Sequence, residues 1–160
     1  MLSNIQVHAK PFEGFWMKKA YMVPKDVPDG NESPDSLATN MEPISVMNVR
    51  SIFVSPEPNQ IIKVGEQTDV QGVAFDGGYG ITKVELSADS GKTWLPAQLD
   101  PDLGKYSWRR WHYNFTASQK GNYNLHVKAT NAKGQTQPLQ QWNRSGYMRN
   151  EIEILPLKAE

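Results

Sequence analysis

Cysteine is absent from this chain of 160 residues. Its absence excludes disulfide bridges, thiolate ligands for a metal and thiol nucleophiles. Histidine is scarce as well, since the chain has only His8, His112 and His126, and no two of them have the i, i+4 spacing of a helical metal site. Metal chemistry would have few ligands to work with.

An excess of charge of either sign is also missing. Lys plus Arg and Asp plus Glu each total 17, so the formal net charge is +0. Such a balance produces no overall field that would attract nucleic acid or an acidic membrane, and we expect neither as a partner. No run approaches the roughly 20 apolar residues that a membrane-spanning helix needs, so no membrane span is predicted.

The sequence signatures of enzyme active sites are missing too. No serine lies in a Gly-x-Ser-x-Gly elbow, and no glycine-rich loop leads into a predicted helix. Several aspartates lie in predicted turns, where the need of the backbone for hydrogen-bond acceptors explains them. From the residues alone we predict no catalytic, cofactor-binding or metal-binding residue in this chain.

The chain does contain a series of short apolar runs with a period of two. Gly- and Pro-rich turns separate them, and the runs are 46–54, 70–75, 81–86, 106–115, 123–129 and 151–155. This period is typical of strands, and strands at hairpin spacing favour a sandwich. The pattern predicts an all-β fold, an immunoglobulin-like sandwich of the E-set type with about seven strands.

Residues 1–44 have a different composition. The stretch 24–35 is rich in Pro, Gly and carboxylates, which is typical of a solvated loop. The apolar residues before it, among them Phe15 and Trp16, are too few for a core of their own, so we expect them to pack on another surface. We therefore predict a loop-rich N-terminal arm over 1–44 and an immunoglobulin-like domain over 45–160.

The segment that begins at Ser87 matches the Asp-box pattern, a hairpin turn shaped by aspartate and glycine and covered by tryptophan. Asp89 can accept backbone N–H groups of its own turn, Gly91 permits a positive φ, and Trp94 supplies burial. The box occurs once, without an internal repeat of roughly 40 to 50 residues. We interpret it as a folding device and not as a glycan site.

Two tryptophans, Trp108 and Trp111, lie three residues apart in a predicted strand. On a regular strand they would face opposite sides, one into the sandwich core and one outward. A bulge could instead turn both rings inward, or the outer ring could lie on a neighbouring arginine. An outward ring would indicate a surface that a partner covers.

A series of motifs follows in order along the chain. They are Gly72–Gly78, Ile81–Ser87, Asp89–Trp94, Tyr106–Trp111, Val127–Asn131, Gln137–Pro138, and Trp142–Asn143 with Gly146, Tyr147 and Asn150. In this order they make residues 45–157 resemble the C-terminal dimerisation domain of the sulfite oxidase family of molybdenum enzymes. Residues 11–21 and 48–51 resemble the connecting segment of bacterial sulfite dehydrogenases.

The resemblance implies an oxidoreductase whose preceding domain holds molybdenum and molybdopterin through a cysteine thiolate and oxidises sulfite or a similar small substrate. This chain has no such cysteine. We therefore expect no cofactor here, and a structural and dimerisation domain that is not catalytic by itself. The implied partners are a second copy in a homodimer, the molybdopterin catalytic domain of the same parent protein and, through that parent, a cytochrome electron acceptor. The implied location is periplasmic.

The resemblance also suggests roles for single residues. We call the last motif of the series, residues 142–147, the closing motif. Eukaryotic members of the family carry in this motif an arginine that helps to bind the substrate oxyanion. Here Arg144 stands one position early, and on an extended segment a one-residue shift turns a side chain to the other face. Arg144 is thus either a substrate-pocket residue or, as we favour, a surface or interface arginine. We expect interface or structural roles for Trp16, Trp111, Trp142, Asn143, Gly146 and Tyr147, and hydrogen bonds from Asn143 and Asn150 to the backbone.

A second class of function stays open, a free-standing β-sandwich module that binds carbohydrate or protein through exposed tryptophans. The arm over 1–44 separates the two hypotheses. A free module has little need of exposed aromatic residues there, whereas a domain docked on a catalytic partner does.

Overall fold

The structure is a computed structural model that describes residues 2–27 and 30–160. The chain divides into two compact units. The smaller comprises Met1–Ser45 and Trp142–Met148, and the larger comprises Val46–Gln141 and Arg149–Glu160. The closing motif therefore groups with the N-terminal segment and not with its neighbours in sequence.

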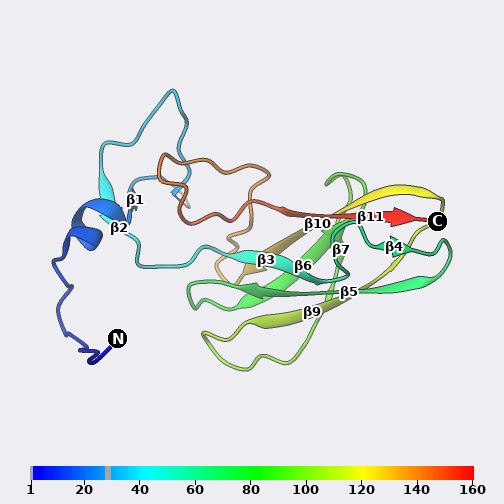
Figure 1. The fold of residues 1–160 in the computed structure, drawn as a ribbon, viewed down its shortest axis with the longest axis horizontal. Coiled ribbons are helices and arrows are strands. Elements are labelled where there is room, and N and C mark those ends of the chain that lie inside the picture. Colours follow the sequence, from blue (N-terminus) through cyan, green and yellow to red (C-terminus); the bar gives the residue numbers. More distant parts are fainter. Residues whose placement is uncertain (1, 28–29) are drawn as a thin grey trace. The chain divides into compact units, whose positions relative to one another are not determined.

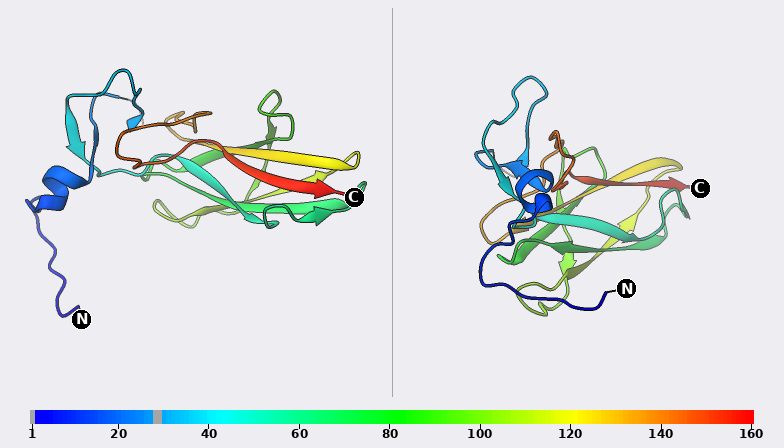
Figure 2. Two further views of the ribbon diagram at one scale, coloured as in Figure 1. Left: turned by 45° about the horizontal axis from the view of Figure 1, so that its top comes forward. Right: turned by 60° about the vertical axis from the view of Figure 1, so that its left-hand side comes forward.

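The larger unit is a β-sandwich (Figure 1). One sheet has the strand order β3-β5-β9-β8, with the bounds β3 Arg50–Ser55, β5 Gln67–Phe75, β9 Arg109–Thr116 and β8 Gln98–Leu99. The other has the order β4-β11-β10-β6-β7, with the bounds β4 Ile61–Ile62, β11 Glu153–Ala159, β10 Gly121–Asn131, β6 Ile81–Ser87 and β7 Leu95–Pro96. Figure 2 shows β10 and β11, in yellow and red, facing β3 and β5.

Alternation along the strands builds the core between the two sheets. In β10 the side chains of Leu125, Val127 and Ala129 are buried, and the residues between them are not. In β11 Leu155 and Leu157 repeat the pattern. Burying one such aliphatic side chain stabilises the fold by about 1.5–3 kcal/mol, which is why a period of two fixes which face turns inward. The predicted all-β, immunoglobulin-like sandwich is confirmed.

The two neighbouring tryptophans face opposite sides, as a regular strand requires. Trp111 is fully buried, its Nε1 donates to Ser51 Oγ at 2.9 Å, and its ring meets Phe53 edge to face at 5.7 Å. Trp108 remains 57% exposed and stacks on Phe75 with 5.5 Å between the ring centroids. Trp111 is thus a structural residue of the core, while Trp108 lies on the surface.

Strand number and bounds differ from the expectation in ways that have physical causes. The strands β4, β7 and β8 have two residues each, too few to produce a visible period. The first long strand begins at Arg50 and not at 46, because only from there does the chain pair with β5. The last strand runs to Ala159, since Lys158 faces outward without interrupting the inward series.

The smaller unit has little regular structure. It contains one π-helical turn, η1 (Trp16–Ala20), and a two-stranded antiparallel sheet of β1 (Met22–Pro24) and β2 (Met41–Pro43). Among its described residues, Val23 is the one large apolar side chain that is buried. A unit with so small a core gains little from hydrophobic burial, so its polar contacts carry more of its order.

Candidate functional site

Aromatic side chains of the smaller unit form a continuous row that we call the aromatic row: Phe15, Trp16, Tyr21 and Tyr147. Adjacent ring centroids are 5.4, 5.7 and 5.4 Å apart. Phe15 and Trp16 are more than 60% exposed, and Tyr21 is 44% exposed. Aromatic pairs at this spacing attract one another, so the rings hold a common surface in place.

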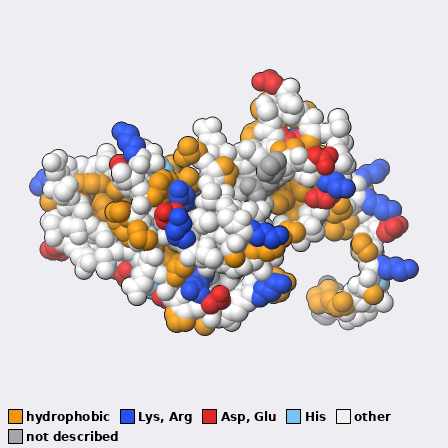
Figure 3. Space-filling model, turned by 180° about the vertical axis from the view of Figure 1, so that it is seen from behind, with side chains coloured by type: hydrophobic (Ala, Val, Ile, Leu, Met, Phe, Trp, Pro, Cys, Tyr) orange, Lys and Arg blue, Asp and Glu red, His pale blue; other side chains and the backbone are white. Residues whose placement is uncertain are grey.

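Other apolar side chains of the N-terminal segment also lie in the open. Leu2, Ile5, Val7 and Phe12 are each more than two-thirds exposed. Figure 3 shows hydrophobic side chains along this segment with solvent around them. Soluble proteins rarely leave a contiguous apolar surface uncovered, and such a surface is typical of an interaction site.

The closing motif folds around Asn143, which is buried. Asn143 Oδ1 accepts from the backbone N–H groups of Ser145 and Tyr147 at 3.1 and 3.3 Å, and its Nδ2 donates to the Tyr147 carbonyl at 2.8 Å. Gly146 supports the turn with a φ of 69°, which other residues adopt only with strain. Asn143 thus organises the backbone of residues 143–147, from which Tyr147 contacts the ring of Tyr21.

Arg144 is engaged by a carboxylate of the same unit. Its Nε lies 3.1 and 3.2 Å from the two Glu32 oxygens, and its Nη2 donates to Glu32 Oε1 and to the Ala38 carbonyl at 2.5 Å each. Glu32 also accepts from the backbone N–H groups of Arg144 and Ala38. The hydrogen bond from the Arg144 side chain is the main reason that the pKa of Glu32 falls to about 2.

This pairing helps to decide between the two hypotheses for Arg144, a substrate-pocket residue and a surface or interface arginine. The side chain of Glu32 is fully buried and compensates the guanidinium charge, so an incoming anion would compete with a carboxylate already in place. A structural arginine fits these contacts better than an anion ligand.

Asn150 differs from the expectation, and that prediction is wrong for its side chain. Its side chain is fully buried, yet neither Nδ2 nor Oδ1 has a hydrogen-bond partner among residues 2–27 and 30–160. Its backbone N–H donates to Gln141 Oε1 at 2.7 Å. A sequence pattern that names an asparagine as a turn residue does not say which of its polar groups the fold uses.

The Asp-box residues Ser87 and Asp89 hold a hydrogen-bonded turn. Asp89 accepts from Thr93 N and Oγ1 at 2.9 and 2.6 Å, and Ser87 Oγ donates to it at 2.7 Å. These hydrogen bonds lower the pKa of Asp89 below its ordinary range. Gly91 has a φ of 83°, and Trp94 Nε1 donates back to its carbonyl at 3.0 Å.

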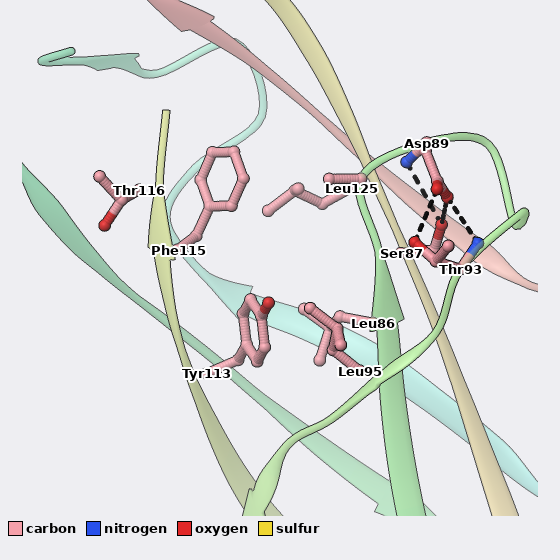
Figure 4. Close-up of a pocket in the computed structure, with 10 residues that line it drawn as sticks. Leu86, Ser87, Asp89, Thr93, Leu95, Tyr113, Phe115, Thr116 and Leu125 are labelled. Carbon is pink, nitrogen blue, oxygen red and sulfur yellow. Dashed lines mark hydrogen bonds between the residues drawn. The ribbon is translucent and has the colours of Figure 1, made fainter. Parts of the chain in front are cut away.

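A cavity of about 270 Å³ lies beside this turn, between β6 and β7 of one sheet and β9 of the other (Figure 4). Leu86, Leu95, Tyr113 and Phe115 form its apolar wall. The polar groups at its rim, Ser87, Asp89 and Thr93, already bond to one another, so they have little capacity left for a ligand. The arrangement agrees with a turn that serves folding.

The donor set of this chain does not fit a pterin-bound molybdenum, because the sequence has no thiolate to hold the metal. Within residues 2–27 and 30–160, no group of three or more His, Asp or Glu side chains could hold a metal ion. Over the same residues, no helix has the length and apolar character needed to cross a membrane.

Comparison with solved structures supports the fold. The chain is similar to the sulfane dehydrogenase SoxCD from Paracoccus pantotrophus, with a TM-score of 0.68 and 21% identity over 93% of this chain and 37% of that chain. It is also similar to the fibronectin(III)-like modules of Clostridium thermocellum CbhA, with a TM-score of 0.50 and 12% identity over 78% of this chain and 58% of that chain. At these identities the likeness concerns the fold alone.

Comparison with curated proteins finds sulfite oxidases and nitrate reductases. Sulfite oxidase of Arabidopsis thaliana is 35% identical over 106 residues, which are 65% of this chain and 26% of that protein. Mitochondrial sulfite oxidase of Drosophila melanogaster is 26% identical over 98% of this chain and 30% of that protein. NADH nitrate reductase 1 of Oryza sativa subsp. japonica is 30% identical over 67% of this chain and 13% of that protein. The chain therefore spans less than a third of the length of these relatives.

The family described as the Mo-co oxidoreductase dimerisation domain matches residues 41–153. The match covers the whole four-stranded sheet, most of the other sheet and the closing motif with Asn143 and Tyr147. The chain belongs to the Mo-co oxidoreductase dimerisation domain family.

Proposed function

We propose that this chain is the dimerisation domain of a sulfite oxidase-type molybdenum oxidoreductase, and that it joins two subunits without taking part in the chemistry. Membership of the dimerisation domain family is the observation that carries the proposal. The absence of a thiolate from the sequence supports a cofactor site in a separate catalytic domain. That domain, with its molybdenum and molybdopterin, is a partner in this proposal.

The aromatic row supplies the proposed docking surface for the catalytic domain. Exposed rings give a large contact area at low entropic cost and are enriched in the cores of interfaces. Trp16 and Tyr147 belong to the row, and Trp142 lies next to Asn143 with 43% of its surface exposed. In this proposal Arg144 fixes the closing motif from which Trp142 and Tyr147 project, and Gly146 permits its turn.

Three finer features belong to the same proposal. The parent enzyme oxidises sulfite or a similar small substrate, it passes electrons to a cytochrome, and it works in the periplasm. The names of the relatives keep the substrate class broad, since they include nitrate reductases beside sulfite oxidases. Several relatives, among them those of Drosophila melanogaster and Mus musculus, are mitochondrial sulfite oxidases.

The test of the dimerisation role is the molar mass of the purified chain in solution, measured by light scattering over a range of concentrations. We expect twice the mass of one chain of 18.1 kDa, with dissociation on dilution. A chain that stays monomeric at all concentrations and binds an oligosaccharide would instead support the β-sandwich binding module.

The prediction that the chain is not catalytic by itself is tested with the same purified sample. We expect no molybdenum by elemental analysis and no sulfite-dependent reduction of an electron acceptor by the chain alone. Addition of a separately produced molybdopterin catalytic domain should give a complex with the wild-type chain and a weaker one with Trp16→Ser. Sulfite turnover by the isolated chain would overturn the non-catalytic role.

A further inference from the structure

The cavity beside the Asp-box turn has a place in the sandwich that suits a binding site. It lies on the flank where each sheet ends in an edge strand of two residues, β7 in one sheet and β8 in the other. Strands this short cover little of the space between β6 and β9, and the cavity of about 270 Å³ lies in that space (Figure 4). Leu95 of β7, which is 54% exposed, forms part of its mouth.

The inner wall of the cavity belongs to the packed core. Leu86 and Leu125 are buried members of the hydrophobic cluster. Phe115 is buried too, and its ring meets the ring of Tyr123 edge to face at 5.3 Å. Tyr123 is fixed in turn, because its hydroxyl donates to the Gln119 carbonyl at 3.0 Å. Such a wall exists before any ligand arrives, as is usual for small-molecule sites.

The rim of the cavity selects against a polar ligand. Ser87 Oγ accepts from the backbone N–H groups of Asp89 and Gly91 at 3.3 and 2.9 Å, and it donates to Asp89 Oδ1 at 2.7 Å. Asp89 also accepts from the backbone and the side chain of Thr93. A sugar would give up hydrogen bonds to water here and find the polar groups of the rim already engaged. An apolar molecule has no such loss, and its burial against the wall is favourable.

Tyr113 adds one polar group to the apolar wall. Figure 4 shows its hydroxyl pointing towards Phe115 and Leu125, across the space that these residues line. Among the residues drawn there, the hydrogen bonds join Ser87, Asp89 and Thr93, and none reaches Tyr113. A phenol can donate one hydrogen bond and accept another, so Tyr113 can hold a single polar group of a ligand whose remainder is apolar.

We propose that this cavity binds a small, mostly apolar molecule, either one aromatic ring or a short aliphatic chain, that carries a single hydroxyl or carbonyl group. The apolar part lies against Leu86, Phe115 and Leu125, and the polar group bonds to Tyr113. A cavity of about 150 Å³ with aliphatic and aromatic walls is large enough for benzene, so about 270 Å³ holds a ring with one or two substituents. The site lies within the larger unit and goes beyond the proposed function, because it does not depend on dimerisation.

The test is a titration of the full, ¹⁵N-labelled chain, followed by NMR, with p-cresol, which carries a hydroxyl, and with toluene, which lacks it. We expect saturable amide shifts that are largest in residues 86–95 and 113–116, with a dissociation constant for p-cresol on the order of 1 mM or lower. Maltose should leave these amides unchanged. Shifts that centre on the exposed tryptophans, or no saturable shift up to about 10 mM p-cresol, would overturn the inference.

Two variants test the geometry of the site. Tyr113→Phe removes the hydroxyl alone, so it should weaken p-cresol about threefold to tenfold and change toluene by less than about twofold. Leu95→Trp places a larger ring at the mouth and should weaken both probes about tenfold or more. Its control is Leu103→Trp, at a leucine that is 75% exposed and lies outside the cavity lining, which should change either probe by less than about twofold. The dispersion of each NMR spectrum shows that the variant is folded.

The outcomes separate this inference from the proposed function. Equal losses for p-cresol and toluene in Tyr113→Phe, or unchanged affinities in folded Leu95→Trp, overturn the inference and leave the dimerisation role untouched. A chain that is monomeric at every concentration and still binds p-cresol in the cavity overturns the dimerisation role alone. A dimer from which p-cresol is excluded, while the monomer binds it, would mean that a second copy covers the mouth, and the small-molecule site would be overturned.

Discussion

At the scale of single residues, Gly72 is the glycine with the least room for a side chain. A Cβ there would lie 2.1 Å from Cζ2 of Trp111 and 2.3 Å from the Ile52 carbonyl oxygen. Both neighbours are fixed, one by its hydrogen bond to Ser51 and one by the β3–β5 ladder. Gly72→Ala should therefore destabilise the sandwich by about 1–3 kcal/mol or more, measured by urea unfolding. Gln71→Ala, at the preceding position and on the outward side, should lower the free energy of unfolding by less. Equal losses for the two variants would contradict the role of close packing at Gly72.

Gln137 is a buried residue whose polar groups hold three segments of the sandwich. Its Oε1 accepts from Ser51 N at 2.6 Å and Ala129 N at 3.0 Å, and its Nε2 donates to the Glu151 carbonyl at 3.0 Å. Gln137→Leu would leave those backbone groups buried without partners, so we expect a loss of about 2–5 kcal/mol in the free energy of unfolding. The exposed Gln140→Leu is the control and should cost under about 1 kcal/mol. Similar unfolding midpoints for the two variants would show that water or relaxation replaces the bonds of Gln137.

At the scale of elements, the contact between the closing motif and residues 30–38 depends on the ionised carboxylate of Glu32. Its pKa falls from 4.5 to about 2 in the folded chain, so the folded state binds its proton less readily than the unfolded state. The stabilisation is therefore complete above about pH 4.5 and is lost as the pH falls towards 2. We expect urea midpoints of the wild type and Glu32→Gln to differ at pH 6 and to converge at low pH. A constant difference across this range would contradict the role of Glu32.

The sandwich could be predicted from sequence because most inward positions of its long strands are apolar and its turns carry recognisable Gly, Pro and Asp residues. Val70 and Ala74 alternate with outward residues, and Asp76 accepts backbone N–H groups from Gly78, Tyr79 and Gly80 within its turn. Such information is local in the chain. A pattern of period two and a turn motif are sufficient to specify it.

The contacts of the smaller unit could not be predicted in the same way. Glu32 and Arg144 are separated by 112 positions, and Tyr21 and Tyr147 by a similar stretch, so no local pattern links them. The composition of residues 24–35 predicts a solvated loop around Glu32, although its side chain is fully buried. A single carboxylate in a segment rich in Pro and Gly gives no indication of the distant arginine with which it pairs.

At the scale of the whole molecule, the two units differ sharply in how much core they have. The sandwich buries a continuous cluster that includes Trp111, Leu125 and Leu155, whereas the described part of the smaller unit buries one large apolar side chain, Val23. Local stability follows buried apolar contact, so the smaller unit should open more readily than the sandwich. Order in the smaller unit would then be completed when its aromatic row is covered by a partner.

This difference predicts two steps of unfolding in the isolated chain. Hydrogen exchange followed by mass spectrometry should show the amides of 22–43 and 142–148 exchanging at lower urea concentration than those of β5, β9 and β10. Glu32→Gln should lower the urea concentration at which the smaller unit exchanges and leave that of the sandwich unchanged. The reason is that Glu32 and its ion-pair partner Arg144 both lie within the smaller unit. Gly72→Ala should do the reverse. Exchange of both units at one urea concentration, shifted equally by either variant, would mean that they unfold as one cooperative body and that the smaller unit does not depend on a partner for its order.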